Sequence, residues 1–184
     1  MNIYAKFICE ERVKMLKQCF DNVREKHPLV HNITNYVTVN DVANILLACG
    51  GSPIMADDSG EVEDITSICQ GLNINIGTLN KNTIPSMFLA GKKANVLGHV
   101  VLLDPVGAGA SGLRTKTANE LVRDIKFTVI RGNISEIRTL MEGTGNTKGV
   151  DADLADAVTE ENLDETIGKL KAFSEATGSV IAVT

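Results

Sequence analysis

The sequence contains no tryptophan, and aromatic residues make up only 4% of its 184 residues. Single-stranded nucleic acids are usually bound by stacking bases on aromatic side chains, so this low content argues against such a partner. Lysine and arginine number 18 against 23 acidic residues, which gives a formal net charge of −5. A chain of this charge lacks the electrostatic attraction that nucleic acids and anionic membranes require, and we expect neither as a partner.

Long apolar segments are also missing. No apolar run approaches the roughly 18 residues that a membrane-spanning helix needs. The first twenty residues carry too many charged side chains, Lys6 and Glu10 among them, for a secretion signal. The four cysteines follow no zinc-binding or C-x-x-C spacing, so we interpret them as small buried residues in a reducing compartment. These absences favour a cytoplasmic protein.

Short apolar segments alternate along the chain with longer segments of helical periodicity. The segments predicted to be strands are 28–33, 52–56, 72–76, 100–103, 127–130 and 180–183. Those predicted to be helices are 13–23, 41–49, 62–69, 83–97, 115–125, 134–141 and 163–176, and a polar surface loop is predicted over 142–158. This alternation predicts the α/β class, with a mostly parallel sheet between two layers of helices. No linker is visible, so residues 1–184 are predicted to form a single domain.

The most informative motif is Leu-Leu-Asp-Pro-Val-Gly-Ala-Gly-Ala, residues 102–110. It places the carboxylate of Asp104 at the end of a buried strand, followed at once by a turn rich in glycine. Glycine lets backbone N–H groups approach an anion, and a carboxylate can hold a divalent cation beside it. The motif therefore indicates a phosphate and metal site. The alternative is a plain corner between a strand and a helix, in which Asp104 caps the turn.

Other polar or distinctive residues also follow predicted strands. In open α/β sheets, ligands bind beyond the carboxyl ends of the strands. We therefore expect one shared edge of the sheet to carry the candidate residues Asn35, Met55, Gly77, Asp104, Arg131, Glu136 and Thr184.

Several of these residues have an alternative structural role. Arg131, next to a glycine, would lie near a bound phosphate or form a surface ion pair. Glu136 would complete a helix cap with Asn133 or hold Mg²⁺ opposite Asp104. Asn35 would bind a substrate hydroxyl or satisfy backbone groups of its own loop. Met55 would form an adaptable apolar wall or belong to the core.

Five motifs in the same order resemble the hydroxyethylthiazole kinases, a family with the ribokinase-like fold. The matching segments are residues 28–35 (PLVHNITN), 51–56 (GSPIMA), 75–79 (NIGTL), 103–110 (LDPVGAGA) and 130–137 (IRGNISEI). The resemblance implies transfer of the ATP γ-phosphate to the hydroxyl of 5-(2-hydroxyethyl)-4-methylthiazole in thiamine biosynthesis. It further implies a homotrimer with each active site between neighbouring subunits.

The resemblance also implies roles for individual residues. Met55 and Gly77 would bind the thiazole substrate, and Asn35 would lie near both the acceptor hydroxyl and the phosphates. Arg131 and Thr184 would bind ATP. Mg²⁺ would be held by a further pair, Asp104 and Glu136.

The family continues past the position of Thr184 to a Gly-Thr-Gly-Cys-type segment, whose amides cradle the transferring phosphate. No cysteine follows Cys69 here, so the chain resembles the amino-terminal two-thirds of the family and no catalytic residue is assigned. Two alternatives to the thiazole kinase remain. One is a non-catalytic remnant that binds thiazole or serves in assembly, and the other is a kinase for a different small alcohol, such as a hydroxymethylpyrimidine or a sugar.

We predict that the 184-residue chain alone phosphorylates the thiazole alcohol poorly, because the phosphate cradle of the family is missing from it. Its turnover number should lie well below the ~1–100 s⁻¹ that is usual for kinases. Product formation from labelled ATP measures this rate. A rate inside the usual range would contradict the prediction.

Overall fold

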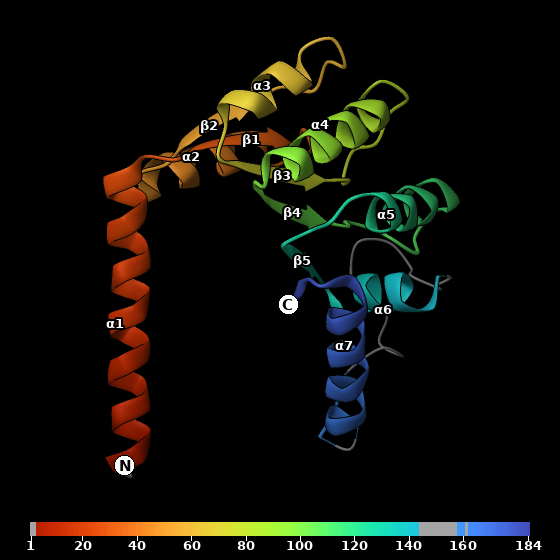
Figure 1. Ribbon diagram of the computed structural model, residues 1–184. Helices are drawn as coiled ribbons and strands as arrows, with labels where there is room; N and C mark the ends of the chain where they lie inside the picture. Colours follow the sequence, from red (N-terminus) through yellow and green to blue (C-terminus); the bar gives the residue numbers. More distant parts are fainter. Residues whose placement is uncertain (1–2, 144–157, 161) are drawn as a thin grey trace.

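The computed structural model describes residues 3–143, 158–160 and 162–184, so most of the predicted loop over 142–158 lies outside the described residues. A six-stranded sheet runs through the molecule in the order β2-β1-β3-β4-β5-β6, and all neighbouring strands are parallel (Figure 1). The strands are β1 (Leu29–Ile33), β2 (Ser52–Met55), β3 (Gly71–Asn75), β4 (Val100–Asp104), β5 (Val129–Gly132) and β6 (Val180–Val183). Each predicted strand is present.

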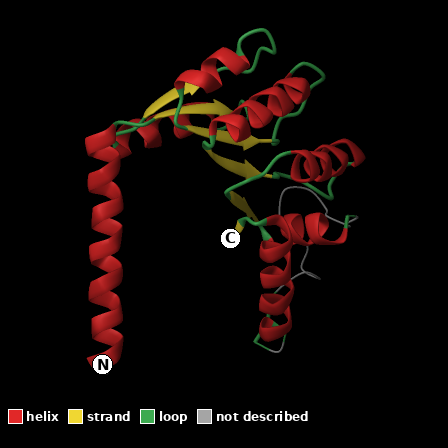
Figure 2. Cartoon of the chain, in the orientation of Figure 1, coloured by secondary structure: helices red, strands yellow, loops and turns green. Residues whose placement is uncertain are grey.

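Each predicted helix is present as well (Figure 2). The helices are α1 (Ile3–Lys26), α2 (Val39–Cys49), α3 (Val62–Ile68), α4 (Thr83–Leu97), α5 (Gly112–Asp124), α6 (Ile134–Glu142) and α7 (Leu163–Thr177). Helix α5 begins three residues earlier than predicted. Its N-cap is Ser111, whose side chain accepts a hydrogen bond from the backbone N–H of Arg114.

The order of the strands explains which face each helix covers. The chain steps from β1 outward to β2 through α2, then back across β1 to β3 through α3. Right-handed crossovers in opposite directions place their helices on opposite faces of the sheet. Helix α2 therefore lies on one face, and α3 to α7 lie on the other (Figure 1). The predicted three-layer α/β arrangement is confirmed, with its two faces unequally covered.

The core lies on the face covered by α3 to α7. Alternate strand residues point into it, and Leu72, Ile74, Val101, Leu103 and Ile130 are at most 2% exposed. The helices contribute Met87, Ala90, Ala94, Ala118, Leu121, Ile137 and others to the same cluster. Burial of each large apolar side chain contributes about 1.5–3 kcal/mol. The core therefore holds the strands, and hence their carboxyl ends, in one register.

The opposite face is more polar and more open. Asn32, Asn73 and Leu102 lie beside one another on this face, on the neighbouring strands β1, β3 and β4. At the start of their strands, Val100 is 57% and Val180 62% exposed. Among the described helices, only α2 and the end of α1 lie on this side (Figure 1).

Helix α1 extends away from the sheet (Figure 1). The prediction that the cysteines are buried is correct for Cys69 and wrong for Cys19, which is exposed because α1 carries it away from the core. Cys49 is partly buried. No helix in the described part of the chain is both long and apolar enough to cross a membrane.

Two helical glycines make a matched test of the packing. A Cβ on Gly91 of α4 would lie 2.3 Å from Cδ1 of Ile125, whereas one on Gly168 of α7 would meet nothing within 4 Å. We predict that Gly91→Ala destabilises the protein by about 1–3 kcal/mol through overpacking. Gly168→Ala should stabilise it by roughly 0.5–1 kcal/mol, because alanine is the better helix former. Urea unfolding measures both changes, and equal effects of the two substitutions would disprove the packing argument.

Candidate functional site

A cavity of about 650 Å³ opens at the carboxyl edge of the sheet. It is bounded by the loops that follow β1, β3 and β4, and by Arg131 of β5. The chain reverses its direction of winding between β1 and β3, and such a switch point is where open α/β sheets bind ligands. The fold therefore places its cavity where this architecture favours a binding site.

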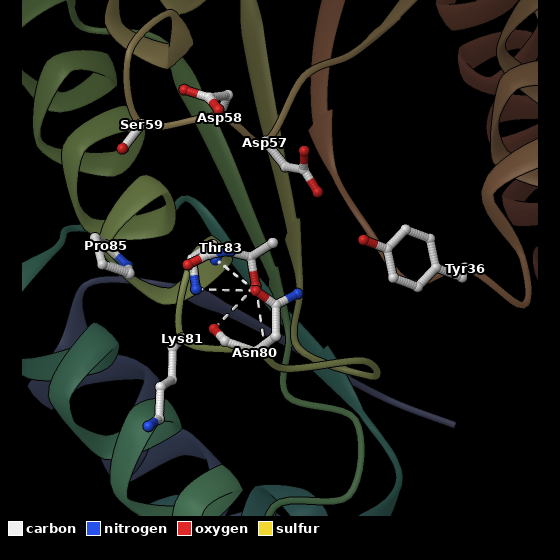
Figure 3. A pocket seen from close by; sticks show the side chains of 9 residues that line it. Tyr36, Asp57, Asp58, Ser59, Asn80, Lys81, Thr83 and Pro85 are labelled. Carbon is white, nitrogen blue, oxygen red and sulfur yellow. Dashed lines mark hydrogen bonds between the residues drawn. The ribbon is translucent and has the colours of Figure 1, made fainter.

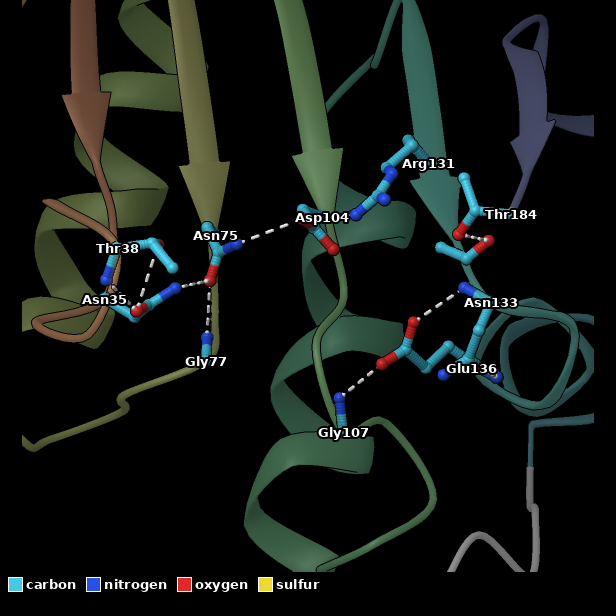
Figure 4. A network of polar contacts seen from close by, with 11 residues as sticks. Asn35, Thr38, Asn75, Gly77, Asp104, Gly107, Arg131, Asn133, Glu136 and Thr184 are labelled. Atoms are coloured by element: carbon cyan, nitrogen blue, oxygen red, sulfur yellow. Dashed lines mark hydrogen bonds and ion pairs between the residues drawn. The ribbon is translucent and has the colours of Figure 1, made fainter. Parts of the chain in front are cut away.

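A chain of polar contacts crosses the strand ends beside this cavity (Figure 4). Asn35 Nδ2 donates to Asn75 Oδ1 at 3.1 Å, and Asn75 Nδ2 donates to Asp104 Oδ2 at 3.0 Å. Arg131 Nη1 donates to the same Asp104 oxygen at 3.2 Å. Side chains from β3, β4, β5 and the loop after β1 are thus linked in one network.

Asn35 is fixed from both ends of its amide. Its Oδ1 accepts hydrogen bonds from the backbone N–H groups of Val37 and Thr38, each at 3.0 Å. The alternative of satisfying its own loop is therefore observed. Gly77 packs closely on this amide pair, since a Cβ there would lie 2.9 Å from Asn75 Oδ1. Its N–H donates to the same oxygen at 2.8 Å, so the close approach depends on glycine.

Asp104 has one engaged and one free carboxylate oxygen. Oδ2 accepts from Asn75 and Arg131, whereas Oδ1 is buried without a hydrogen-bond partner. Burial raises the pKa of Asp104 above its ordinary value, although the charge of Arg131 and the hydrogen bonds from Arg131 and Asn75 act against this rise. A buried carboxylate oxygen left unpaired is costly and suits a cation as its partner.

Glu136 is held by backbone amides. Its Oε1 accepts from Gly107 N–H at 2.7 Å and its Oε2 from Asn133 N–H at 2.8 Å. Asn133 Oδ1 in turn accepts from Glu136 N–H at 2.9 Å, which completes a capping box at the start of α6. Burial raises the pKa of Glu136, and the two backbone hydrogen bonds oppose the rise. The capping alternative is thus observed, and it ties α6 to the glycine turn.

Arg131 of β5 and Thr184, the residue just after β6, lie side by side (Figure 4). The side chain of Arg131 is 48% exposed and forms its ion pair with Asp104 at the cavity. The backbone N–H of Thr184 donates to Gly132 O at 3.0 Å. The expected shared edge is therefore observed for these residues.

Met55 stands apart from the network. It ends the edge strand β2, is 37% exposed and is absent from the cavity lining. The chain just beyond it is held by His31, whose Nε2 lies 2.8 Å from Ala56 O. Burial lowers the pKa of this imidazole, so we expect it to be neutral at pH 7 and to donate from Nε2.

A second hollow of about 580 Å³ lies at the loop that follows β2 (Figure 3). The loop carrying Asp57 and Asp58 borders it on one side, and the loop carrying Asn80 borders it on another. Asn80 Oδ1 accepts backbone hydrogen bonds from Asn82 and Thr83, which shapes the start of α4. Within the described ranges, no three histidine, cysteine or acidic side chains gather closely enough to hold a metal ion.

Sequence reasoning assigned no role to Asn75 or Arg114. Asn75 is the central link of the network, and its place as a polar residue at the carboxyl end of β3 was a signal for it. Arg114 lines the cavity from the first turn of α5. No signal in the sequence distinguishes it from a surface arginine of an amphipathic helix.

The hydroxyethylthiazole kinase family model matches residues 20–184. The chain belongs to this family. It is 68% identical over 170 residues to hydroxyethylthiazole kinase from Clostridium acetobutylicum, covering 92% of this chain and 62% of that protein. It is 57% identical over 162 residues to the enzyme from Clostridium tetani, covering 88% of this chain and 58% of that one.

A solved structure of a hydroxyethylthiazole kinase protein from Pyrococcus horikoshii has the same fold. Its TM-score is 0.79 at 36% sequence identity, and the match covers 93% of this chain and 61% of that one. The chain thus spans about 60% of the length of these relatives. Family and fold are settled by this agreement, and the described network lies within the matched residues.

The raised pKa of Asp104 predicts how its substitution acts at different pH. Its ionised form is disfavoured in the folded protein, so folding is penalised at pH 7, and the penalty disappears as the pH falls below the ordinary value near 4. Asp104→Asn should therefore raise the melting temperature at pH 7. The gain should shrink towards pH 4.

Asp124→Asn is the matched control for this measurement. Its carboxylate is exposed and hydrogen-bonded to Arg123, which lowers the pKa of Asp124. A carboxylate with a lowered pKa stabilises the folded protein at pH 7, so this substitution should not raise the melting temperature there. A lower melting temperature for Asp104→Asn at neutral pH would contradict the assigned electrostatics.

Proposed function

We propose that this protein phosphorylates the hydroxyl of 5-(2-hydroxyethyl)-4-methylthiazole with ATP, in the biosynthesis or salvage of thiamine. The observation that carries the proposal is the unpartnered, buried oxygen of Asp104, which lies beside Arg131 at a cavity on the switch point. Membership of the hydroxyethylthiazole kinase family supports this alcohol over a pyrimidine or a sugar. Use of ATP fits a cytoplasmic location.

The cavity suits the acceptor alcohol. Val37, Val42 and Val106 contribute apolar lining, which fits a small and weakly polar thiazole ring. Asn35 and Gly77 lie at the same cavity and would orient the hydroxyl. The amide of Asn35 is already fixed by the loop and by Asn75, so little side-chain entropy is lost when a substrate binds.

Mg²⁺ would be held by Asp104, whose free oxygen fits a hard cation. Glu136 would act indirectly, because it holds the turn after Asp104 through the N–H of Gly107. When bound, the ion neutralises charge on the phosphate oxygens. Arg131 keeps N–H groups beyond its bond to Asp104 and would bind the phosphates of ATP. Thr184, just after the neighbouring strand β6, would contact the same nucleotide.

In the reaction, the hydroxyl oxygen forms a bond to the γ-phosphorus, the bond from that phosphorus to the ADP oxygen breaks, and the hydroxyl proton is released. Such transfer depends on positioning and charge stabilisation more than on covalent help from the protein. The described residues supply positioning through Asn35 and a positive charge through Arg131.

We further propose that the protein forms a homotrimer with sites shared between subunits. Met55 lies on the edge strand, outside the cavity of its own chain, and is exposed enough to line such a shared site. The exposed apolar side chains of Ile45 and Leu47 on the neighbouring α2 also favour a partner there.

Isothermal titration tests the acceptor assignment without requiring turnover. We predict that Asn35→Ala weakens binding of the thiazole alcohol about tenfold, which corresponds to ~1.4 kcal/mol. Asn95→Ala is the control, because Asn95 bonds Lys126 at the other end of the sheet. It should leave binding within about twofold. Tighter binding of a hydroxymethylpyrimidine than of the thiazole alcohol by the unaltered chain would refute the proposed substrate.

A further inference from the structure

Arg114 joins two loops at the cavity. It lies in the first turn of α5, and its side chain reaches back over the glycine turn. Nη1 donates to Val106 O at 3.1 Å, in the loop after β4, and Nη2 donates to Gly77 O at 2.5 Å, in the loop after β3. The guanidinium is thereby held in one orientation at the cavity wall.

The surrounding backbone is shaped to admit this guanidinium. Gly107 adopts a φ of +72°, and a Cβ on it would lie 2.3 Å from Arg114 Nη1. Any other residue at position 107 would therefore displace the guanidinium, besides being strained in this conformation. The Ser111 cap fixes the backbone of Arg114 from the other side. The position is thus built by the turn and by the helix start together.

The charge of Arg114 is left uncompensated by its partners. Both of its hydrogen-bond partners are neutral carbonyls, which orient a cation without cancelling its charge. Arg131, by contrast, is paired with Asp104. A guanidinium has five N–H donors, so three remain after the two carbonyls are satisfied.

The charge balance of the cavity favours an anion. Its charged lining residues are Asp104, Arg114 and Arg131, which sum to one positive charge in a chain of net charge −5. Glu136 lies behind Gly107 and is absent from the lining. A preoriented arginine beside a local positive excess is the arrangement that binds phosphate oxygens in a forked geometry.

We propose that Arg114 is a phosphate-binding residue of this cavity and contacts the phosphoryl group that is transferred. This inference rests on the proposed function, because the phosphoryl group comes either from ATP or from the phosphorylated thiazole alcohol. In both cases the ligand chemistry is a terminal phosphate dianion. The apolar part of the cavity remains for the thiazole ring, so Arg114 should discriminate between the alcohol and its phosphate.

The test is isothermal titration of the chain with three ligands: the thiazole alcohol, its phosphate ester, and ATP with Mg²⁺. We predict that Arg114→Gln weakens binding of one or both phosphate ligands by about 10- to 100-fold, as loss of a charged hydrogen bond does. Binding of the alcohol should stay within about twofold. Arg123→Gln, at an exposed arginine bonded to Asp124, should change none of the three.

The two phosphate ligands show whether the phosphoryl group bound by Arg114 belongs to ATP or to the ester. If Arg114→Gln binds only ATP more weakly, Arg114 contacts the nucleotide. If it binds only the ester more weakly, Arg114 contacts the product. Unchanged binding of both ligands to Arg114→Gln would overturn the inference, as would failure of the unaltered chain to bind either one. Binding of the ester that depends on Arg114, together with tighter binding of a hydroxymethylpyrimidine than of the thiazole alcohol, would support this inference while contradicting the proposed function.

Arg114→Lys covers the case in which Arg114→Gln fails to fold. Lysine keeps the positive charge but lacks the forked N–H donors of the guanidinium. Binding of the phosphate ligands should therefore weaken by roughly 3- to 10-fold, and binding of the alcohol should not change. An equal loss for the alcohol and the phosphate ligands would show that Arg114 acts only by bracing the two loops. That result would overturn the inference.

Discussion

The site depends on the parallel register of β1, β3, β4 and β5. Cα pairing places Asn75 directly beside Asp104, and the same register brings Arg131 next to it. Because all strands run in one direction, their polar final residues meet at a single edge. The hydrogen bonds from Asn35 through Asn75 to Asp104 follow from this pairing. A shift of one residue in any strand would turn these side chains to the core face.

The glycine turn after β4 is the second constraint, and it serves three side chains. Glu136 accepts from the N–H of Gly107, and Arg114 occupies the space that a side chain at Gly107 would fill. Asp104 immediately precedes the turn. Helices α5 and α6 are thereby anchored to the same short segment. Stability and ligand binding are coupled here, because the residues that hold the turn are buried and the cavity begins at its surface.

The burial of Asp104 connects the fold to its chemistry. A carboxylate kept from water, with one oxygen unpaired, is unfavourable in the empty protein. Such an arrangement is relieved by a cation and is characteristic of functional sites, where local stability is lost for the sake of binding. Arg131 compensates only one oxygen of Asp104.

The two faces of the sheet are unequally covered by helices. The face that carries Asn73 and Val180 is therefore open to a further layer of structure.

Much of the architecture could be predicted from the sequence, because strands and helices each produce a local pattern of apolar residues. The alternation of apolar and amphipathic segments determined every strand and helix, and the five motifs determined the family. The pairing of Asp104 with a glycine turn was also visible. Tertiary structure alone decided that Glu136 caps α6 while binding Gly107, that Met55 lies outside the cavity, and that Arg114 lines it. These outcomes depend on contacts between segments far apart in the chain, for which local sequence carries no periodic signal.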